Sequence, residues 1–263
     1  MTAPLTLRRR VRHVVQRSAC IVLLFVVWEA LPRLGLVNPA FLSPPSAVAA
    51  TIFSWFADGS VWKHLAASLQ RSFIGLLLAV AAGVSTGLLM GWFSRFEAFV
   101  DPVLQLMRQT SAFALFPVFL LFLVIGEASK VAIIFWASFW PVLLNTISGV
   151  KQVDRLLILS ARSMGASQAF IFGKVVLPAA LPAIFTGVRL AGAYSITALV
   201  AAEMIGAHAG LGFLTLNSQE TFQIPSMYAG ILLLAVLGLA LNVLLARLEA
   251  RLTSWRKGLQ HDA

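Results

Sequence analysis

The sequence predicts an all-α membrane protein, a polytopic bundle of six transmembrane helices with both termini in the cytoplasm. Three observations predict this fold: the composition, a series of long apolar segments, and the placement of basic residues between them. Of the 263 residues, 59% are hydrophobic and 11% are charged, whereas a soluble domain carries roughly 25% charged residues. This deficit of charge indicates a chain whose surface faces lipid rather than water.

Six apolar segments are long enough to cross a bilayer, which takes about 20 helical residues. They cover residues 19–36, 65–92, 100–125, 131–150, 181–206 and 227–248. We expect the first of them to be retained as a span, because no A-x-A cleavage pattern follows its apolar core. A shorter run at 48–56 follows the residues FLSPPS, so we expect an interfacial helix there, with Ser46 as its N-cap.

Lysine and arginine residues set the predicted orientation. With the N-terminus in the cytoplasm, the inner segments hold fourteen of these residues and the outer segments hold three. Positive residues accumulate on the cytoplasmic side of membrane proteins. We therefore expect a basic cytoplasmic segment at residues 1–18, a transmembrane domain at 19–248 and a cytoplasmic tail at 249–263.

Other classes of protein fit the sequence poorly. The net charge of +10 does not come from a basic stripe interleaved with aromatic residues, so we expect no nucleic-acid partner. The single cysteine, Cys20, excludes an internal disulfide and a cysteine-based metal cluster. No Walker A, dinucleotide-binding or HExxH pattern occurs, and the four histidines are scattered. We therefore expect neither an enzyme nor a cofactor or metal ion bound by this chain.

Polar residues inside apolar spans are costly and point to function. The candidates for lining a pathway are Arg71, Arg108, Asn145, Tyr194 and Ser195. Arg71 could bind an anion, or backbone carbonyl groups or a neighbouring side chain could hold it. Arg108 could instead extend to the inner membrane face, and the three uncharged side chains could simply bond a neighbouring helix.

Small residues recur every four positions in the second apolar segment, at Gly75, Ala79, Gly83, Gly87 and Gly91. Such a stripe lies on one helical face and lets another helix approach closely. The partner could be a helix of the same chain. Alternatively, the stripe could form a seam in a transport core or at a dimer interface.

The cytoplasmic loop between the fourth and fifth apolar segments has a pattern of its own. Asp154 can cap a helix that follows it, and Gly165 then ends this helix or turns the chain sharply. A second short amphipathic helix is expected at 167–176, ended by Pro178 and Pro182. Because proline is tolerated in the first turn of a helix, the pair is also expected to mark the start of the fifth span. The apolar face of this helix–glycine–helix hairpin could pack on the bundle or the membrane surface, or it could dock a cytoplasmic protein.

The stretch SARSMGASQAFIFGKVVLPAALPAI in this loop resembles the EAA loop of ABC importer permeases. The stretches WEALPRLGLVNPAFLSPPSAV, GEASKVAIIFWASFWPVLLNTISGVKQVD and AAEMIGAHAGLGFL are similar to successive blocks of the nitrate/sulfonate/taurine branch of that family. The resemblance implies the type I ABC importer permease fold, with residues 151–178 as the ATPase-coupling loop. Its coupling residues would be Leu159, Ser160, Ala161, Arg162, Met164, Gly165, Ala166 and Pro178.

Two departures from the family pattern bear on function. Of the EAA triplet only Ala161 matches, and Leu159 stands in place of the glutamate, which removes one polar docking contact. In the third apolar segment, MRQTSAFALFPV keeps Pro117 but lacks the earlier prolines of the family. This second departure keeps a neutral heteroaromatic solute among the candidates.

The resemblance also implies partners. Two copies of the chain would form the pathway in the bacterial inner membrane, and two cytoplasmic ATPase subunits would bind ATP and Mg²⁺. A periplasmic binding protein would deliver the solute near residues 206–212. The expected solute is a small anion such as a sulfonate, taurine or nitrate, and the alternative is a pyrimidine or flavin-type vitamin precursor. An ion-coupled secondary transporter is a further alternative, although the sequence shows no internal repeat and few acidic residues at mid-span.

Overall fold

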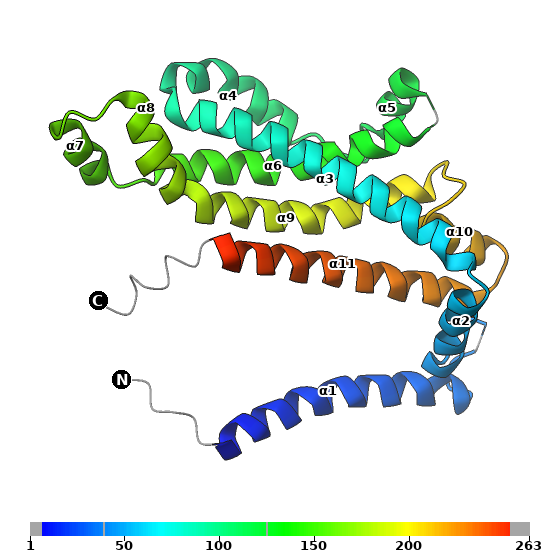
Figure 1. Ribbon diagram of the computed structural model, residues 1–263. Coiled ribbons are helices and arrows are strands. Elements are labelled where there is room, and N and C mark those ends of the chain that lie inside the picture. Colours follow the sequence, from blue (N-terminus) through cyan, green and yellow to red (C-terminus); the bar gives the residue numbers. More distant parts are fainter. Residues whose placement is uncertain (1–6, 39, 125, 253–263) are drawn as a thin grey trace. The chain divides into compact units, whose positions relative to one another are not determined.

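The computed structural model describes residues 7–38, 40–124 and 126–252, and every regular element in these ranges is helical (Figure 1). The elements are α1 (Leu7–Arg33), α2 (Pro45–Ala57), α3 (Ser60–Trp92), α4 (Ser94–Arg108), α5 (Phe116–Leu123), α6 (Glu127–Lys151), α7 (Arg155–Ser163), α8 (Gln168–Ile171), the π-helical turn η1 (Phe172–Val176), α9 (Leu177–Met204), α10 (Leu211–Glu220) and α11 (Ile224–Leu252). The predicted all-α fold class is confirmed.

Four helices in the described part of the chain are long and apolar enough to cross a membrane. They are Ser60–Trp92, Glu127–Lys151, the continuous helix Gln168–Met204, and Ile224–Leu252. Neither α1 nor the region of the third predicted span is among them, so the count of six spans stays a prediction. The predicted cytoplasmic segments 1–18 and 249–263 fall mostly outside the residues whose side chains the structure describes.

The third predicted span is wrong as a single helix. Residues 94–123 instead form α4 and α5, separated by a non-helical segment at 109–115. Pro117 lies in the first turn of α5, where its missing N–H leaves no helical hydrogen bond unmade. The polar residues after Arg108 therefore occupy a break between two helices rather than the interior of one.

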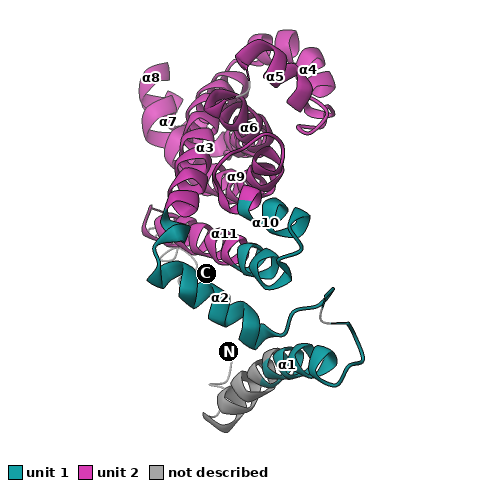
Figure 2. Cartoon of the chain, turned by 90° about the vertical axis from the view of Figure 1, so that its right-hand side faces the viewer, with its two compact units in different colours: residues 1–62, 214–232 teal, residues 63–213, 233–263 magenta. Residues whose placement is uncertain are grey.

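The chain divides into two compact units, which Figure 2 colours separately. The first comprises Met1–Trp62 and Leu214–Leu232, and the second comprises Lys63–Phe213 and Leu233–Ala263. Both candidate sites described below lie within the second unit.

Within the first unit, the end of α1 is bonded to the start of α2. The Glu29 carboxylate accepts hydrogen bonds from the Ser46 backbone N–H at 3.0 Å and from its hydroxyl at 2.7 Å. α2 begins at Pro45 with Pro44 as its N-cap residue, and Pro44 has no side-chain cap to offer. The prediction that Ser46 caps this helix is therefore wrong. Glu29 supplies from α1 the acceptor that an N-cap side chain would otherwise provide.

Within the second unit, the small-residue stripe of α3 packs against α6 of the same chain. An added Cβ atom would come within 2.6–2.9 Å of an α6 side chain at each of four positions. The pairs are Gly75 with Ile134, Gly83 with Val142, Gly87 with Thr146, and Gly91 with Val150. A normal carbon contact is about 3.5–4.0 Å, so only glycine allows the helices to approach this closely. Of the two alternatives for the stripe, packing within the chain is the one that the structure shows.

α6 and α9 lie side by side and form the centre of the second unit (Figure 1). An added Cβ at Gly187 of α9 would lie 2.7 Å from the Asn145 Cβ of α6, and the Ser138 hydroxyl donates to the Ala191 carbonyl at 3.3 Å. This close pair is the platform on which the pocket described below is built.

Candidate coupling hairpin and intramembrane pocket

α7 begins and ends at residues with defined backbone roles. The Asp154 carboxylate accepts a hydrogen bond of 2.8 Å from a backbone N–H in the first turn, which confirms the predicted N-cap. After the helix, Gly165 adopts a φ of +79°, and its N–H donates to the Arg162 carbonyl at 2.9 Å. The N–H of Ala166 donates to the Ala161 carbonyl at 3.1 Å. This is a Schellman turn, in which the left-handed position favours glycine, so the predicted turn at Gly165 is confirmed.

The second half of the hairpin continues directly into a membrane span. Ser167 caps α8 by accepting a 3.3 Å hydrogen bond from the Phe170 N–H. The π-helical turn and α9 then follow without a break. The prediction that Pro178 and Pro182 end a helix here is wrong, because the helix continues through both residues. The prediction that the pair marks the start of the fifth span is confirmed for Pro178, which lies in the first turn of α9, whereas Pro182 lies inside α9. The π turn changes the hydrogen-bond register just before Pro178, which offers no backbone donor.

The hairpin presents large apolar side chains to its surroundings. Leu159 is 56% exposed and Met164 is 81% exposed, and Leu156 and Phe170 are exposed as well. Among the predicted coupling residues, Leu159, Ser160, Arg162, Met164 and Gly165 are exposed, Ala166 and Pro178 are half-buried, and Ala161 is buried. The structure thus gathers seven of these eight residues on one hairpin, with Pro178 in the first turn of α9, and leaves most of them accessible.

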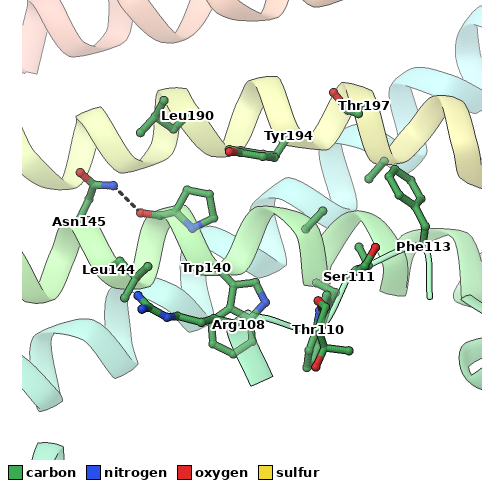
Figure 3. Close-up of a pocket in the computed structure, with 15 residues that line it drawn as sticks. Arg108, Thr110, Ser111, Phe113, Trp140, Leu144, Asn145, Leu190, Tyr194 and Thr197 are labelled. Atoms are coloured by element: carbon green, nitrogen blue, oxygen red, sulfur yellow. Dashed lines mark hydrogen bonds between the residues drawn. The ribbon is translucent and has the colours of Figure 1, made fainter. Parts of the chain in front are cut away.

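A pocket of about 490 Å³ lies between the non-helical segment after α4 and the middle of α6 and α9 (Figure 3). Its polar lining consists of Arg108, Thr110, Ser111, Asn145, Tyr194 and Thr197. Its larger apolar side chains are Phe113, Trp136, Trp140, Leu144 and Leu190. No Asp or Glu is among the described residues that line it. No group of three or more His, Cys, Asp or Glu in the described ranges could hold a metal ion.

The pocket brings together three of the five predicted pathway residues, Arg108, Asn145 and Tyr194. The Asn145 amide donates to an α6 carbonyl one turn earlier at 2.8 Å, which fixes its orientation (Figure 3). Ser195 does not line the pocket. It is fully buried, and its hydroxyl donates to an α9 carbonyl at 2.7 Å. Arg71 lies in a different place, described below.

Sequence reasoning missed the tryptophans of the pocket. The Trp136 Nε1–H donates to the Thr110 carbonyl at 3.4 Å and so bonds the α4–α5 segment to α6. Trp140 lines the pocket one turn further along α6. The four-residue spacing of Trp136, Trp140 and Leu144 places them on one helical face, and this spacing is the signal that could have found them.

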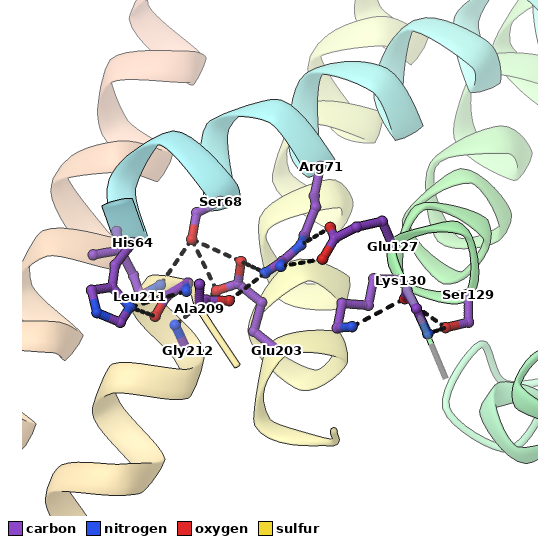
Figure 4. Close-up of polar contacts among 12 residues, drawn as sticks. His64, Ser68, Arg71, Glu127, Ser129, Lys130, Glu203, Ala209, Leu211 and Gly212 are labelled. Carbon is purple, nitrogen blue, oxygen red and sulfur yellow. Dashed lines mark hydrogen bonds and ion pairs between the residues drawn. The ribbon is translucent and has the colours of Figure 1, made fainter. Parts of the chain in front are cut away.

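Arg71 is buried and lies in a charge cluster that joins α3, α6 and α9, in which Glu203 is buried and Glu127 is exposed (Figure 4). Its Nε and Nη2 atoms bind the two oxygens of Glu127 at 2.5 and 2.6 Å. Its Nη1 atom lies 2.8 Å from Glu203 Oε1 and donates to the Ala209 carbonyl at 2.6 Å. The side chain of Arg71 is 4% exposed and that of Glu203 is 0% exposed. Of the alternatives for Arg71, retention by neighbouring groups is therefore the one that the structure shows.

Glu203 also accepts a hydrogen bond from the segment that follows α9, residues 206–212. Its two oxygens lie 2.8 and 2.9 Å from the Ser68 hydroxyl, which donates to them, and Oε2 accepts the Gly212 N–H at 2.8 Å. Gly210 has a φ of +130°, and a Cβ there would overlap the Glu203 carboxylate. The cluster thus bonds the predicted solute-delivery segment 206–212 to the ends of three helices.

Two comparisons of the sequence give the family. Residues 75–254 match the binding-protein-dependent transport system inner membrane component family. The chain is 36% identical over 254 residues to the taurine transport system permease protein TauC of Escherichia coli (strain K12), covering 95% of this chain and 92% of the relative. It is 33% identical over 233 residues to the putative aliphatic sulfonates transport permease protein SsuC of Bacillus subtilis (strain 168), covering 89% and 84%.

The fold is also found in solved structures. An inward-facing structure of the MetNI methionine ABC transporter matches with a TM-score of 0.60 at 19% identity, covering 76% of this chain and 98% of that one. At this identity the likeness concerns the fold alone, and it agrees with the type I importer permease fold expected from the sequence. The chain belongs to the binding-protein-dependent transport system inner membrane components and is a permease subunit of an ABC importer.

Proposed function

We propose that two copies of this chain form the translocation pathway for a small organic anion of the sulfonate type in a bacterial inner membrane. A periplasmic binding protein delivers the solute. Two ATPase subunits bind ATP and Mg²⁺ and dock on the hairpin formed by α7 and α8. Closure of the ATPase pair draws the two hairpins together and switches the spans between inward- and outward-facing states.

The exposed apolar hairpin is the observation that supports ATPase docking. Exposed Met164 and Leu159 side chains, on a helix that the family resemblance places in the cytoplasm, are unfavourable unless another surface covers them. The Schellman turn at Gly165 fixes the angle at which they are presented. With leucine at position 159, docking is mainly apolar, and the exposed Arg162 is available for an acidic group of the partner.

The solute class is supported by the relatives and by the pocket. The two relatives above are named for taurine and for aliphatic sulfonates, and the pocket offers the cation Arg108 and no lining carboxylate in the described ranges. The formylaminopyrimidine transport permease protein ThiX of Halalkalibacterium halodurans is 29% identical over 249 residues. A pyrimidine is therefore the second candidate, and Trp136 and Trp140 would suit its flat ring.

The docking proposal is tested by co-purification. The tagged full-length chain is expressed with the ATPase and binding-protein genes beside its own, extracted in mild detergent, and assayed for co-eluting ATP hydrolysis. Met164→Asp places a charge on the apolar docking surface, and we expect it to lower the co-eluting activity at least about tenfold, a penalty of about 1.4 kcal/mol in binding. Met164→Leu is the matched control and retains the activity. Equal activity in both variants would show that the hairpin is not the docking element.

A further inference from the structure

The pocket between the α4–α5 break, α6 and α9 holds polar groups that nothing in the described chain satisfies. We propose that it is a solute-binding site within the permease that selects organic anions with an apolar body and without an ammonium group. This inference rests on the proposed transport function and narrows its substrate class. On this inference the pocket binds alkyl and aryl sulfonates more tightly than the zwitterion taurine.

The first observation is a break in the helical backbone at membrane depth. The pocket is lined by Trp136 to Asn145, which form the middle of the membrane-spanning helix α6. Residues 109–115 face this part of α6 without being helical. Within a bilayer, non-helical backbone is stable only where protein buries it or where it lines a polar cavity. The break therefore indicates a polar site at this depth, as in other transporters with interrupted helices.

The second observation is the difference between the two arginines. Arg71 donates hydrogen bonds from Nε, Nη1 and Nη2, with Glu127 and Glu203 as counter-charges. Arg108 makes no hydrogen bond or ion pair with any residue that the structure describes, and it lines the pocket. Arg108 is exposed in the single chain, and a guanidinium that lines a pocket without a carboxylate beside it is free to bind an anion. Arginine also suits the planar two-oxygen edge of a sulfonate or carboxylate.

The third observation is a set of further unsatisfied donors. The Trp140 Nε1–H is buried and has no hydrogen-bond partner. The hydroxyls of Ser111 and Tyr194, also in the lining, have no partner among the described residues and are exposed, so they are open to a ligand. Polar groups in a membrane interior are normally bonded. A pocket rich in free donors is therefore completed by a ligand that brings acceptors, such as the oxygens of a sulfonate.

The remaining lining restricts the rest of the ligand. Phe113, Leu144 and Leu190 offer apolar surface to an alkyl or aryl body. A ligand ammonium would meet no carboxylate in the described lining, and it would lie in the field of Arg108. The aromatic faces could attract it by cation–π contact, but the nearby guanidinium opposes this attraction. The pocket therefore favours a sulfonate with an apolar tail over one with an ammonium.

The test uses two probes of nearly the same shape, 1-propanesulfonate and taurine, which differ by a methyl and an ammonium group. Binding to the full-length chain in phosphatidylcholine nanodiscs is measured by saturation-transfer difference NMR. We expect 1-propanesulfonate to bind at least about tenfold more tightly than taurine, and Arg108→Gln to weaken its binding at least about tenfold. Arg95→Gln removes the same charge from the exposed start of α4 and leaves the binding unchanged.

The outcomes separate this inference from the proposed function. Equal binding of taurine and 1-propanesulfonate, no saturable binding of either, or equal effects of Arg108→Gln and Arg95→Gln would each overturn the selective site. Loss of 1-propanesulfonate binding in phosphatidylglycerol nanodiscs would overturn it as well, because a lipid phosphate would then be the anion that Arg108 holds. None of these results would alter ATPase co-purification, which depends on the hairpin and tests the transport function separately.

Discussion

The Nη1 atom of Arg71 lies 2.8 Å from Oε1 of Glu203, and these side chains are 4% and 0% exposed in two membrane-spanning helices. Attraction between buried charges offsets their desolvation only when their other donors and acceptors are also bonded. Here Glu127 accepts two further N–H groups of the guanidinium. Ser68 and Gly212 donate to Glu203. The pair is therefore a structural clamp between α3, α9 and the segment after α9.

Removing one partner of this clamp should cost far more stability than removing a partner of an exposed pair. Glu203→Ala removes the buried counter-charge of Arg71 and leaves the Gly212 N–H without its acceptor, and we expect a loss of about 3 kcal/mol in the free energy of unfolding. The matched control is Glu97→Ala, which breaks the more exposed pair with Lys151 and should cost less than about 1 kcal/mol. Unfolding in mixed micelles measures both changes. Similar losses in the two variants would contradict the clamp.

Gly210 should tolerate no side chain, because a Cβ atom would overlap the Glu203 carboxylate and the φ of +130° is unfavourable for other residues. We expect Gly210→Ala to lower the free energy of unfolding by about 2 kcal/mol or more. Gly126→Ala is the control, because its φ is −165° and no atom lies within 4 Å of an added Cβ. Equal free energies of unfolding for Gly210→Ala and Gly126→Ala would contradict the described packing of residues 206–212 on Glu203.

The sequence predicts helix caps and turns correctly where residues close together in the chain determine them. The cap at Asp154 and the turn at Gly165 each depend on residues within one or two helical turns. The small-residue stripe gave the packing face of α3, because helical periodicity fixes which residues share a face. It did not give the partner, since several spans offered a suitable surface.

The errors and omissions have a tertiary origin. Glu127 and Glu203 are 56 and 132 positions from Arg71 in the sequence, so no spacing rule links them. The local pattern predicts Ser46 as a cap, because it does not show that Glu29 of the preceding helix supplies the acceptor. The proline pair predicts an end to the short helix before it, but the π turn that precedes Pro178 lets the helix continue into α9.

Alanine substitutions at two helical glycines should change the free energy of unfolding in opposite directions. One glycine, Gly83, lies in the contact between α3 and α6, and the other, Gly238, lies on α11. Gly83→Ala would place a Cβ 2.9 Å from Val142, and overpacking of this kind typically destabilises by about 1–3 kcal/mol. Gly238→Ala on α11 would place a Cβ 3.6 Å from Ile196, which is ordinary contact, and its better helix propensity should stabilise by up to about 1 kcal/mol. Thermal unfolding in detergent measures both shifts. A destabilised Gly238→Ala would show that the packing around α11 differs from that described.

The turn at Gly165 gives a prediction about coupling that rests on the proposed function. Valine is β-branched and disfavours a positive φ, whereas asparagine is one of the few residues that adopt it readily. No atom lies within 4 Å of an added Cβ at Gly165, so the two variants differ in backbone preference rather than in contacts with the rest of the chain. We expect Gly165→Val to lower solute uptake about tenfold or more, and Gly165→Asn to retain most of it.

Uptake of labelled sulfonate by cells that express the complete transporter measures this difference, with membrane levels of each variant quantified in parallel. The exposed Met164 precedes Gly165 directly, so any change in the turn alters the direction in which the docking surface is presented. Because the turn lies outside the membrane-spanning helices, the strain of Gly165→Val should stay local, at about 1–3 kcal/mol in the free energy of unfolding, while the variant uncouples transport. Equal uptake by the valine and asparagine variants would mean that transport does not depend on the left-handed turn, and the hairpin would then couple through its helices alone.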